Sequence, residues 1–357
     1  MLGNRKLIVD AFCEVKEFTK AFQDAEFHNF AAEDPKPGAV YLISRQQFTA
    51  NIEKIKELAI ADTILPILGN PAEGSDTILR HIEHLGIVDL VRQNKILLIV
   101  GGYLQADIPS LYYENFLPKI LDYNENLQAI KEYQTQYSTD RPYKFLFLNG
   151  RARSHRRHLL HRLQPVLDQA IWTNLDNTHG EPIQLLDPKY EFDFYQNNTA
   201  TNESGFVKYK LFNNDWGEIY LASNPYTDTY FSLVTETVFD YPYSFRTEKI
   251  WKPIAIGHPF IAVANAGYYR DLHQLGFKTF GNLIDESFDS IGDNQERLER
   301  IAQLVEWLCQ QDLASFVKEC YNVCKYNQQQ LAELGPKIRA EFPNRFEQYI
   351  NEHLHIR

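Results

Sequence analysis

Two buried-strand patterns, each bordered by a helical pattern, constrain the fold more than any other feature of the chain. The first covers residues 95–102 and ends in Gly101 and Gly102, after an amphipathic helical pattern over 75–92. The second covers residues 143–150 and runs directly into an Arg-rich helical pattern. Strands that are apolar on both faces are typical of parallel sheets with helices on each side. The sequence therefore predicts an α/β protein built on parallel sheets.

The length of 357 residues is sufficient for two α/β domains of ordinary size. We expect two Rossmann-like domains facing a cleft, because enzymes of this kind bind their ligands between such halves. The polar stretch 120–142 is the expected linker, and Gly335-Pro336 is expected to end an amphipathic helix pair over 294–334. The expected parts are an N-terminal domain at 1–140, a second domain at 141–334 and a helical tail at 335–357.

Composition and charge exclude several classes of function. The net charge of −11 argues against general nucleic-acid binding, which needs a basic surface. No stretch approaches the ~18–20 apolar residues of a membrane span. The apolar run at the start of the chain is too short for a secretory signal, so we expect a cytoplasmic protein whose membrane association, if any, is peripheral.

Metal sites and common cofactor motifs are not expected either. The four cysteines lack the paired spacing of a zinc site and are expected as buried free thiols: Cys13, Cys309, Cys320 and Cys324. The chain has no GxGxxG, Walker A, GxSxG or HExxH motif. Glu191-Phe192-Asp193 is the nearest approach to an Asp-x-Asp metal motif. We therefore expect neither a metal nor a bound cofactor.

The most informative segment follows an apolar strand pattern that ends at Glu236. Parallel sheets bind ligands at the carboxyl ends of their strands. Ten residues later, Arg246-Thr247-Glu248-Lys249 opens a helix that Thr247 or Ser244 is able to cap, and the free amides of such a first turn attract an anion. A carboxylate pairs well with ribose hydroxyls, and an ammonium pairs with phosphate. An ordinary solvated charge pair is the alternative for Glu248 and Lys249.

The pattern beyond this helix start continues the α/β alternation. It predicts a helix to Ile256, a strand at 259–263, a helix at about 266–275 and a strand at 277–280. His258 falls in the turn before the first of these strands, where a structural or ligand-lining role is expected.

A cluster of arginines follows the strand pattern at 143–150. Five Arg lie within residues 151–162, on a chain that is acidic as a whole. Guanidinium groups at a strand-to-helix turn suit the binding of a diphosphate. A solvated helix face and an interaction patch for nucleic acid are the alternatives.

Over roughly residues 143–280 the chain resembles the α1,3-fucosyltransferase family. That family has a strand ending in Phe-Glu-Asn, then a Tyr-x-Thr-Glu-Lys helix start, an apolar helix and a Val-Pro-Val-like strand. This chain has Thr-Glu-Thr at 235–237, Phe-Arg-Thr-Glu-Lys at 245–249 and Gly-His-Pro-Phe-Ile at 257–261. It departs from the family at Thr237 and Phe245, and the Glu236–Glu248 spacing is longer. GDP-fucose is the first expectation for the donor, and another nucleotide-sugar is the alternative.

The resemblance implies a GT-B glycosyltransferase that transfers a sugar with inversion and without a metal. Its partners would be a nucleotide-sugar donor and a carbohydrate or other hydroxyl acceptor. In the family the Glu and Lys of Thr-Glu-Lys contact the ribose and the diphosphate, and an Arg after the first strand contacts the diphosphate. Arg156 is the best match for that arginine and Arg153 the second. The expected donor-binding set is Arg153, Arg156, Arg246, Thr247, Glu248 and Lys249.

An inverting transfer needs a base that takes the proton of the acceptor hydroxyl, commonly Asp or Glu. In this architecture the base comes from the N-terminal domain, and Glu73 and Asp107 follow predicted strands there. Glu236 is the other candidate for the catalytic carboxylate, although contact with the donor sugar is the role we expect for it. The rival function is a non-catalytic nucleotide- or glycan-binding protein on the same fold.

Overall fold

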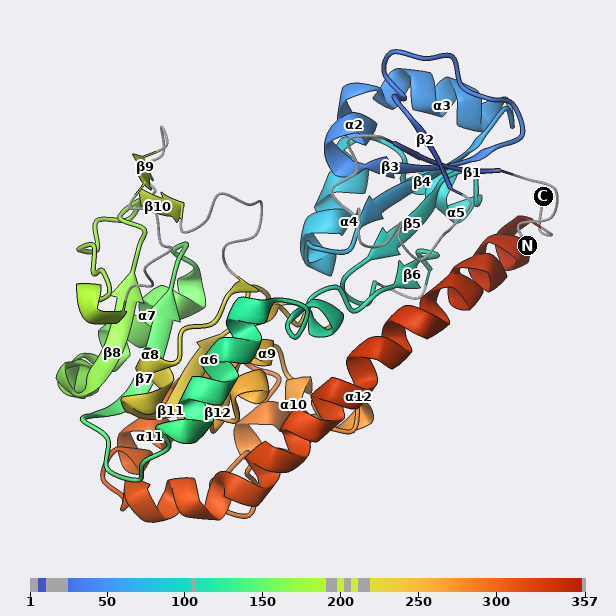
Figure 1. Cartoon of the computed structure of the whole chain (residues 1–357). Coiled ribbons are helices and arrows are strands. Elements are labelled where there is room, and N and C mark those ends of the chain that lie inside the picture. Colours follow the sequence, from blue (N-terminus) through green and yellow to red (C-terminus); the bar gives the residue numbers. More distant parts are fainter. Residues whose placement is uncertain are drawn as a thin grey trace. The chain divides into compact units, whose positions relative to one another are not determined.

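The chain forms two compact units, each with a parallel sheet and helices (Figure 1). The first comprises residues 1–115 and 335–357, and the second comprises 116–334. The computed structural model describes residues 6–10, 25–104, 107–190, 198–201, 207–210 and 219–354. The prediction of a two-domain mixed α/β protein with parallel sheets is confirmed.

The sheet of the first unit has the strand order β2-β1-β3-β4-β5-β6, and all of its pairings are parallel. Its elements are β1 (Leu7–Asp10), β2 (Glu26–His28), β3 (Val40–Ser44), α2 (Arg45–Ala50), α3 (Ile52–Ile60), β4 (Leu65–Asn70), α4 (Ser75–His84), α5 (Val88–Arg92), β5 (Leu97–Val100) and β6 (Leu111–Tyr112).

Both faces of this sheet are buried, as its apolar strands require. Ile78 and Ile82 of α4 pack with Ile8 and Tyr41 in the core on one face. On the other face, strand residues such as Val9 pack against aromatic and aliphatic residues far along the chain, namely Phe342, Phe346, Tyr349 and Ile350. The core on this second face therefore combines residues from the early strands with residues near the end of α12.

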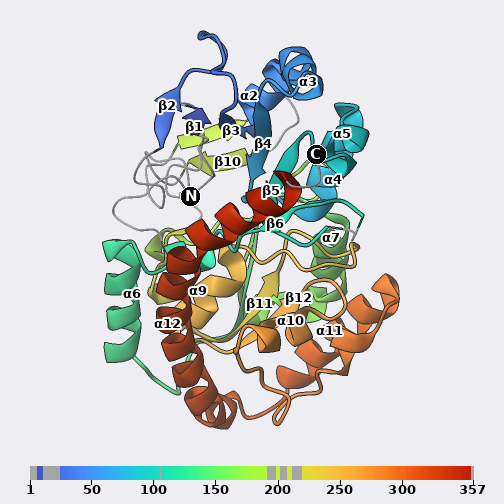
Figure 2. The same ribbon diagram turned by 90° about the vertical axis from the view of Figure 1, so that its right-hand side faces the viewer.

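These late residues belong to α12 (Leu313–Leu354), one continuous ribbon in both views (Figure 1, Figure 2). The prediction that Gly335-Pro336 ends the helix is wrong, because the helix continues through Pro336 and Pro343. Proline removes a backbone hydrogen bond from a helix interior. Burial of the apolar stripe of α12 against the first sheet, in the core that contains Val9, offsets that loss, since tertiary packing overrides local propensity.

The second unit has a sheet of order β12-β11-β7-β8, again wholly parallel, and a separate antiparallel pair β10-β9. Its elements are η1 (Leu117–Lys119), α6 (Asn124–Thr135), β7 (Tyr143–Asn149), α7 (Ser154–Arg162), η2 (Gln164–Gln169), β8 (Ala170–Asn174), η3 (Pro188–Tyr190), β9 (Asn198–Thr201), β10 (Val207–Lys210), α8 (Asn224–Thr227), β11 (Thr229–Thr235), α9 (Glu248–Ile256), β12 (Phe260–Val263), α10 (Tyr268–Gln274), η5 (Ser287–Ser290), α11 (Asn294–Leu308) and the first part of α12.

The division between the units lies earlier than the boundary at 140 expected from the sequence. Residues 116–140 belong to the second unit, because α6 is tied to it by a buried asparagine. Asn126 Nδ2 donates to the carbonyl oxygens of Ile120 at 2.7 Å and Ile219 at 3.2 Å, and its Oδ1 accepts from the Leu221 N–H at 2.7 Å. The residues at 335–357, expected as a separate tail, are part of the first unit.

The strand predicted at 277–280 is also wrong, since these residues form no β-ladder. Their apolar character serves ring packing instead: Phe277 lies against Trp251, and Phe280 lies edge-on to Phe260. Between them, the Lys278 N–H donates to Asn327 Oδ1 of α12 at 2.8 Å. A side-chain amide thus takes the place of a neighbouring strand.

Candidate functional site

The topology of the second sheet marks one place for a ligand. The chain passes from β7 to β8 on one side and later returns to β11 on the other side of β7. The carboxyl ends of β7 and β11 therefore form a topological switch point, where open α/β sheets bind their ligands. The two strands end in Asn149 and Thr235, and Thr235 Oγ1 donates to Asn149 Oδ1 at 2.8 Å. The Nδ2 of buried Asn149 has no hydrogen-bond partner among the described residues.

Arg156 reaches this edge from α7, and the residue is only 3% exposed. Its Nη2 donates to the carbonyl oxygens of Thr235 at 2.9 Å and Glu236 at 3.3 Å, and its Nη1 donates to that of Arg151 at 3.0 Å. Burial, followed by the charge of Arg153, lowers the pKa of Arg156 to about 10. Within the part of the chain that the structure describes, its Nε has no hydrogen-bond partner, and the charges of the Glu236 and Glu248 carboxylates oppose this lowering of its pKa. A buried cation of this kind favours an anion nearby.

Glu236 follows β11 directly and is wholly buried. Its Oε1 accepts from the Thr247 N–H at 3.0 Å and the Tyr268 hydroxyl at 2.9 Å, and its Oε2 accepts from the Thr247 hydroxyl at 2.7 Å. Burial raises the pKa of Glu236 above its ordinary value, against the opposing effects of the Lys249 ammonium and the bonds from Thr247. The carboxyl group thus links the end of β11 to the starts of α9 and α10.

The start of α9 has the capped form that the sequence predicts. Thr247 is the N-cap, and its hydroxyl accepts from the Lys249 N–H at 3.3 Å. The Lys249 ammonium lies 2.6 Å from Glu248 Oε1 and is 29% exposed, which leaves it accessible to a ligand. Burial opposes ionisation of Glu248, but the charges of Lys249 and Lys252 outweigh it and lower the pKa of Glu248. An ionised carboxylate, an ammonium and free amides therefore lie together at one helix end.

The other expected donor-binding residues occupy different environments. Arg153 is the N-cap residue of α7 and is half-buried at the turn after β7. Arg246 is 2% exposed and precedes the α9 cap, so its guanidinium lies inside the fold.

Two buried side chains that the sequence analysis missed hold the loop between β11 and α9. His155 of α7 stacks on Phe239 with ring centroids 5.0 Å apart, and its Nε2 lies 3.0 Å from the Glu236 carbonyl oxygen. The guanidinium of Arg297 from α11 lies 4.3 Å from the centroid of the same Phe239 ring, and its Nη2 donates to the Phe239 carbonyl oxygen at 2.9 Å. The sequence does contain a signal for Asn149, which is a polar residue at the end of a buried strand pattern. The residues around Arg297 contain no pattern that indicates a role at this site.

His258 lies at the other edge of the sheet, before the amino end of β12, and so is structural rather than ligand-lining. Its Nδ1 lies 2.9 Å from the Ser232 hydroxyl, and its Nε2 lies 2.7 Å from the Thr229 carbonyl oxygen. Burial, with a smaller effect of Arg141, lowers its pKa to about 3.

This histidine gives a pH prediction. Because His258 stays neutral in the folded protein but is protonated in the unfolded chain below its ordinary pKa of 6.5, stability is complete above pH 6.5 and falls as the pH drops toward 3. The loss is about 1.4 kcal/mol per pH unit for this one group. Urea unfolding between pH 7 and pH 5 should therefore give a shallower pH slope for His258→Asn than for the unchanged protein. Equal slopes would contradict the assignment.

In the first unit, the two carboxylates expected as catalytic bases lie in surface ion pairs. Glu73 is 43% exposed and lies 3.6 Å from an Arg45 nitrogen. Asp107 is 56% exposed and pairs with Arg92 at 2.8 Å. Neither is enclosed by the fold, so nothing in their surroundings distinguishes them from ordinary surface carboxylates.

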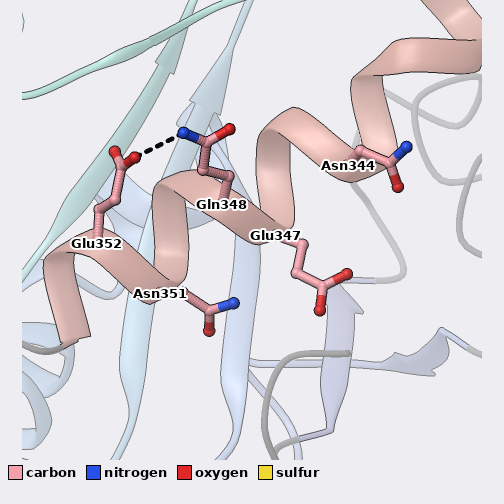
Figure 3. A pocket seen from close by; sticks show the side chains of 5 residues that line it. All are labelled: Asn344, Glu347, Gln348, Asn351 and Glu352. Carbon is pink, nitrogen blue, oxygen red and sulfur yellow. Dashed lines mark hydrogen bonds between the residues drawn. The ribbon is translucent and has the colours of Figure 1, made fainter.

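An open hollow of about 420 Å³ runs along the last turns of α12 (Figure 3). Gln348 Nε2 points toward Glu352 and donates to its Oε1 at 2.7 Å. None of the residues expected from the sequence to form the site lines it; its lining residues are Asn344, Glu347, Gln348, Asn351 and Glu352.

The remaining sequence expectations concern metals and membranes. Cys309, Cys320 and Cys324 are buried free thiols, whereas Cys13 and the Glu191–Asp193 motif lie outside the described residues. The described residues include no cluster of three or more His, Cys, Asp or Glu side chains suited to a metal ion. In the same residues, no helix is both long and apolar enough to cross a bilayer. Comparison of the chain with protein-family models, curated protein sequences and solved structures finds no match.

Proposed function

We propose that the protein is a glycosyltransferase that moves a sugar from a nucleotide-sugar to a hydroxyl acceptor with inversion and without a metal. GDP-fucose is the first donor to test, and another nucleotide-sugar is the alternative. In this proposal the two units are Rossmann-like domains of the GT-B kind. The second would bind the donor, and the first would serve the acceptor.

The observation that carries the proposal is the buried guanidinium of Arg156 beside Asn149 at the switch point of the second sheet. Both side chains have a buried N–H with no partner in the described ranges, at Arg156 Nε and Asn149 Nδ2. Buried donors are nearly always paired in folded proteins, so two unpaired donors at one strand edge support a ligand rich in acceptor oxygens. A diphosphate has such oxygens and the negative charge that suits a guanidinium.

The start of α9 supplies further positive charge for this ligand. The free amides after Thr247 and the partly exposed Lys249 would neutralise the diphosphate as it departs from the sugar, and Glu248 would accept from the ribose hydroxyls. Because the carboxyl group of Glu236 is wholly buried and bonded to Thr247 and Tyr268, we assign it to positioning this helix start rather than to proton transfer.

The same burial of Glu236 favours a second candidate function, a nucleotide- or glycan-binding protein without turnover. A thermal-shift screen of GDP, UDP, CDP, dTDP and their sugars identifies the ligand, since binding to the native state raises its stability. Release of nucleoside diphosphate from the selected sugar then separates the enzyme from the binding protein. No shift with any of these compounds would refute both functions.

Lys249 provides the direct test of the donor site. Replacing it by Ala should weaken binding of the selected nucleoside diphosphate by about 1.5–3 kcal/mol, the contribution of a hydrogen bond to a charged group. Isothermal titration calorimetry measures this change, and Lys318→Ala on the exposed face of α12 is the matched control. Unchanged affinity in a folded Lys249→Ala protein would remove the ammonium from the proposed site.

A further inference from the structure

The loop that follows β8 contacts the arginine-bearing turn that follows β7, and both segments lie in the second unit. β7 and β8 run side by side in parallel, with Asn149 paired to Asn174 at their carboxyl ends (Figure 1). The turn 150–153 then connects β7 to α7, while the loop 175–183 leaves β8. This is the edge where a parallel sheet binds its ligands.

The loop 175–183 is closed at its base by its own hydrogen bonds. Asn174 and Gln184 form an antiparallel bridge, in which each N–H donates to the carbonyl oxygen of the other residue at 2.9 Å. Asn174 Nδ2 also donates to the Pro182 carbonyl oxygen at 2.9 Å. Gly180 has a φ of +87°, a left-handed conformation that glycine adopts without strain. These contacts make the loop a fixed support for the side chains that it carries.

Asp176 of this loop makes the contact with the turn and is only 6% exposed. Its Oδ2 accepts from the Ala152 N–H at 2.7 Å, and its Oδ1 accepts from the Thr178 N–H at 2.9 Å and from the Thr178 hydroxyl. Burial opposes ionisation of Asp176, but the bonds from Thr178 and Ala152 outweigh it and lower the pKa of Asp176. The carboxylate is therefore ionised at neutral pH, and both of its oxygens are engaged.

The peptide group between Arg151 and Ala152 is held from both sides. Its N–H donates to Asp176, and its carbonyl oxygen accepts from Arg156 Nη1 at 3.0 Å. Arg156 in turn donates to the Thr235 carbonyl oxygen at 2.9 Å. A carboxylate and a guanidinium on opposite sides of one peptide group make both hydrogen bonds charge-assisted. The turn is therefore connected to the end of β8 on one side and to the end of β11 on the other.

A second carboxylate of the same loop holds the first turn of α7. Glu181 Oε1 accepts from Arg157 Nε at 2.5 Å, and the Glu181 side chain is 9% exposed. Arg162 at the end of α7 pairs with two glutamates of α11. Carboxylates of the chain thus neutralise two of the five arginines at 151–162, and neither of these two lies on the turn.

The turn 150–153 presents its positive charge beside open space. Arg151 is exposed and Arg153 is half-buried. A methyl group added at Gly150 would meet no atom of the described residues within 4 Å. Besides burial, charges on both this turn and the start of α9 act on the pKa of Arg156, so the two segments lie at one edge of the sheet. An anion at this edge would therefore meet the guanidinium groups of the turn.

We propose that Asp176 is a positioning residue of the donor site: by holding the Arg151–Ala152 peptide group, it fixes the turn from which the Arg153 guanidinium binds the diphosphate. The inference rests on the proposed function, since it concerns the same donor site. Asp176 carries a negative charge, so loss of this charge alone would favour an anion. Weaker binding of a nucleoside diphosphate after loss of Asp176 is the opposite of that direct effect and reports the position of the turn.

The test measures binding of GDP to the full chain by isothermal titration calorimetry, or of UDP, CDP or dTDP if the thermal-shift screen selects one of them. Asp176→Asn replaces one accepting oxygen by a donor, which releases the turn. Asp176→Asn and Arg153→Ala should each weaken binding about 10–100-fold. Because Asp176 acts through Arg153, the double variant should bind no more than about 2-fold more weakly than the weaker single variant.

Glu286→Gln is the matched control. Glu286 also accepts from one backbone N–H, that of Phe280 at 2.7 Å, and from one threonine hydroxyl, that of Thr279 at 2.7 Å. It lies in the same unit but outside the proposed donor site. Glu286→Gln should lose stability to urea, as Asp176→Asn does, and keep its affinity for the nucleotide. A purely structural role for Asp176 predicts instead that both variants keep this affinity.

The exposed Thr178 provides a second variant in case Asp176→Asn does not fold. Thr178→Val removes the hydroxyl that orients Asp176 and should weaken binding about 2–10-fold, and Thr178→Ser should restore the lost affinity. Unchanged affinity in Thr178→Val, unchanged or tighter binding in a folded Asp176→Asn protein, or losses that add in the double variant would overturn the inference, while nucleotide binding by the unchanged protein keeps the proposed function intact. Failure of the unchanged protein to bind any of these nucleoside diphosphates overturns the proposed function and the inference with it.

Discussion

Arg156→Gln is expected to lower the free energy of unfolding by about 2–4 kcal/mol, because hydrogen bonds of a charged group contribute about 1.5–3 kcal/mol each and a shorter amide leaves buried carbonyls unpaired. The guanidinium joins α7 to the end of β11 through the Thr235 and Glu236 carbonyl oxygens. Urea unfolding followed by circular dichroism measures the loss.

The matched control for this change is Arg300→Gln. Arg300 pairs with Asp285 on the surface, where the two side chains are 47% and 48% exposed. Exposed pairs of this kind contribute about 0–1 kcal/mol, so the control should unfold almost as the unchanged protein does. If Arg156→Gln were as stable as Arg300→Gln, Arg156 would not hold the strand edge together. The same Arg156 variant should also lose nucleoside diphosphate binding if the proposed donor site is correct.

Glu236→Leu is expected to destabilise the protein by about 3–5 kcal/mol, since the Thr247 and Tyr268 groups that donate to the carboxyl oxygens would be left buried and unpaired. Glu236→Gln is the milder companion, because its amide oxygen still accepts from one pair of donors. Comparison of the two variants by urea unfolding separates the lost hydrogen bonds from the lost charge. A Glu236→Leu protein as stable as Glu236→Gln would contradict the linking role of the carboxyl group.

The raised pKa of Glu236 adds a pH signature. The folded protein binds the Glu236 proton more tightly than the unfolded chain does, so this group lowers stability as the pH rises from its ordinary pKa of 4.5 through the raised folded value. Glu236→Gln cannot titrate. This rise in pH should therefore lower the free energy of unfolding of the unchanged protein relative to that of Glu236→Gln. A difference that is constant with pH would show that the carboxyl group keeps its ordinary pKa.

The local features of the fold were predictable from the sequence. Apolar runs identified β5 and β7, and the Thr-Glu-Lys pattern identified the capped start of α9, with Thr247 as one of two expected caps, because strand burial and helix capping depend on residues close together in the chain. The errors arose where distant residues decide the outcome. Phe277 and Phe280 are apolar because rings pack on them, and the helix continues through Pro336 because a remote sheet covers its next turns.

The candidate site was predictable by residue type but not by exposure. Arg156 and Glu236 were both expected from the sequence, yet both are buried and bonded within the fold. The sequence around the arginine cluster at 151–162 does not indicate which of its side chains is buried, because burial depends on how α7 lies against the end of β11.

The path of α12 has a consequence for the order in which the protein matures on the ribosome. One face of the first sheet is completed only by Phe342, Phe346, Tyr349 and Ile350. The strands of that sheet, complete by residue 112, must wait for more than two hundred further residues before this face is covered. Domains commonly fold in the order of synthesis. Here the whole sheet of the second unit is synthesised before the core of the first unit can be completed. In a ribosome-bound chain, the second unit should therefore become resistant to protease before the first unit does.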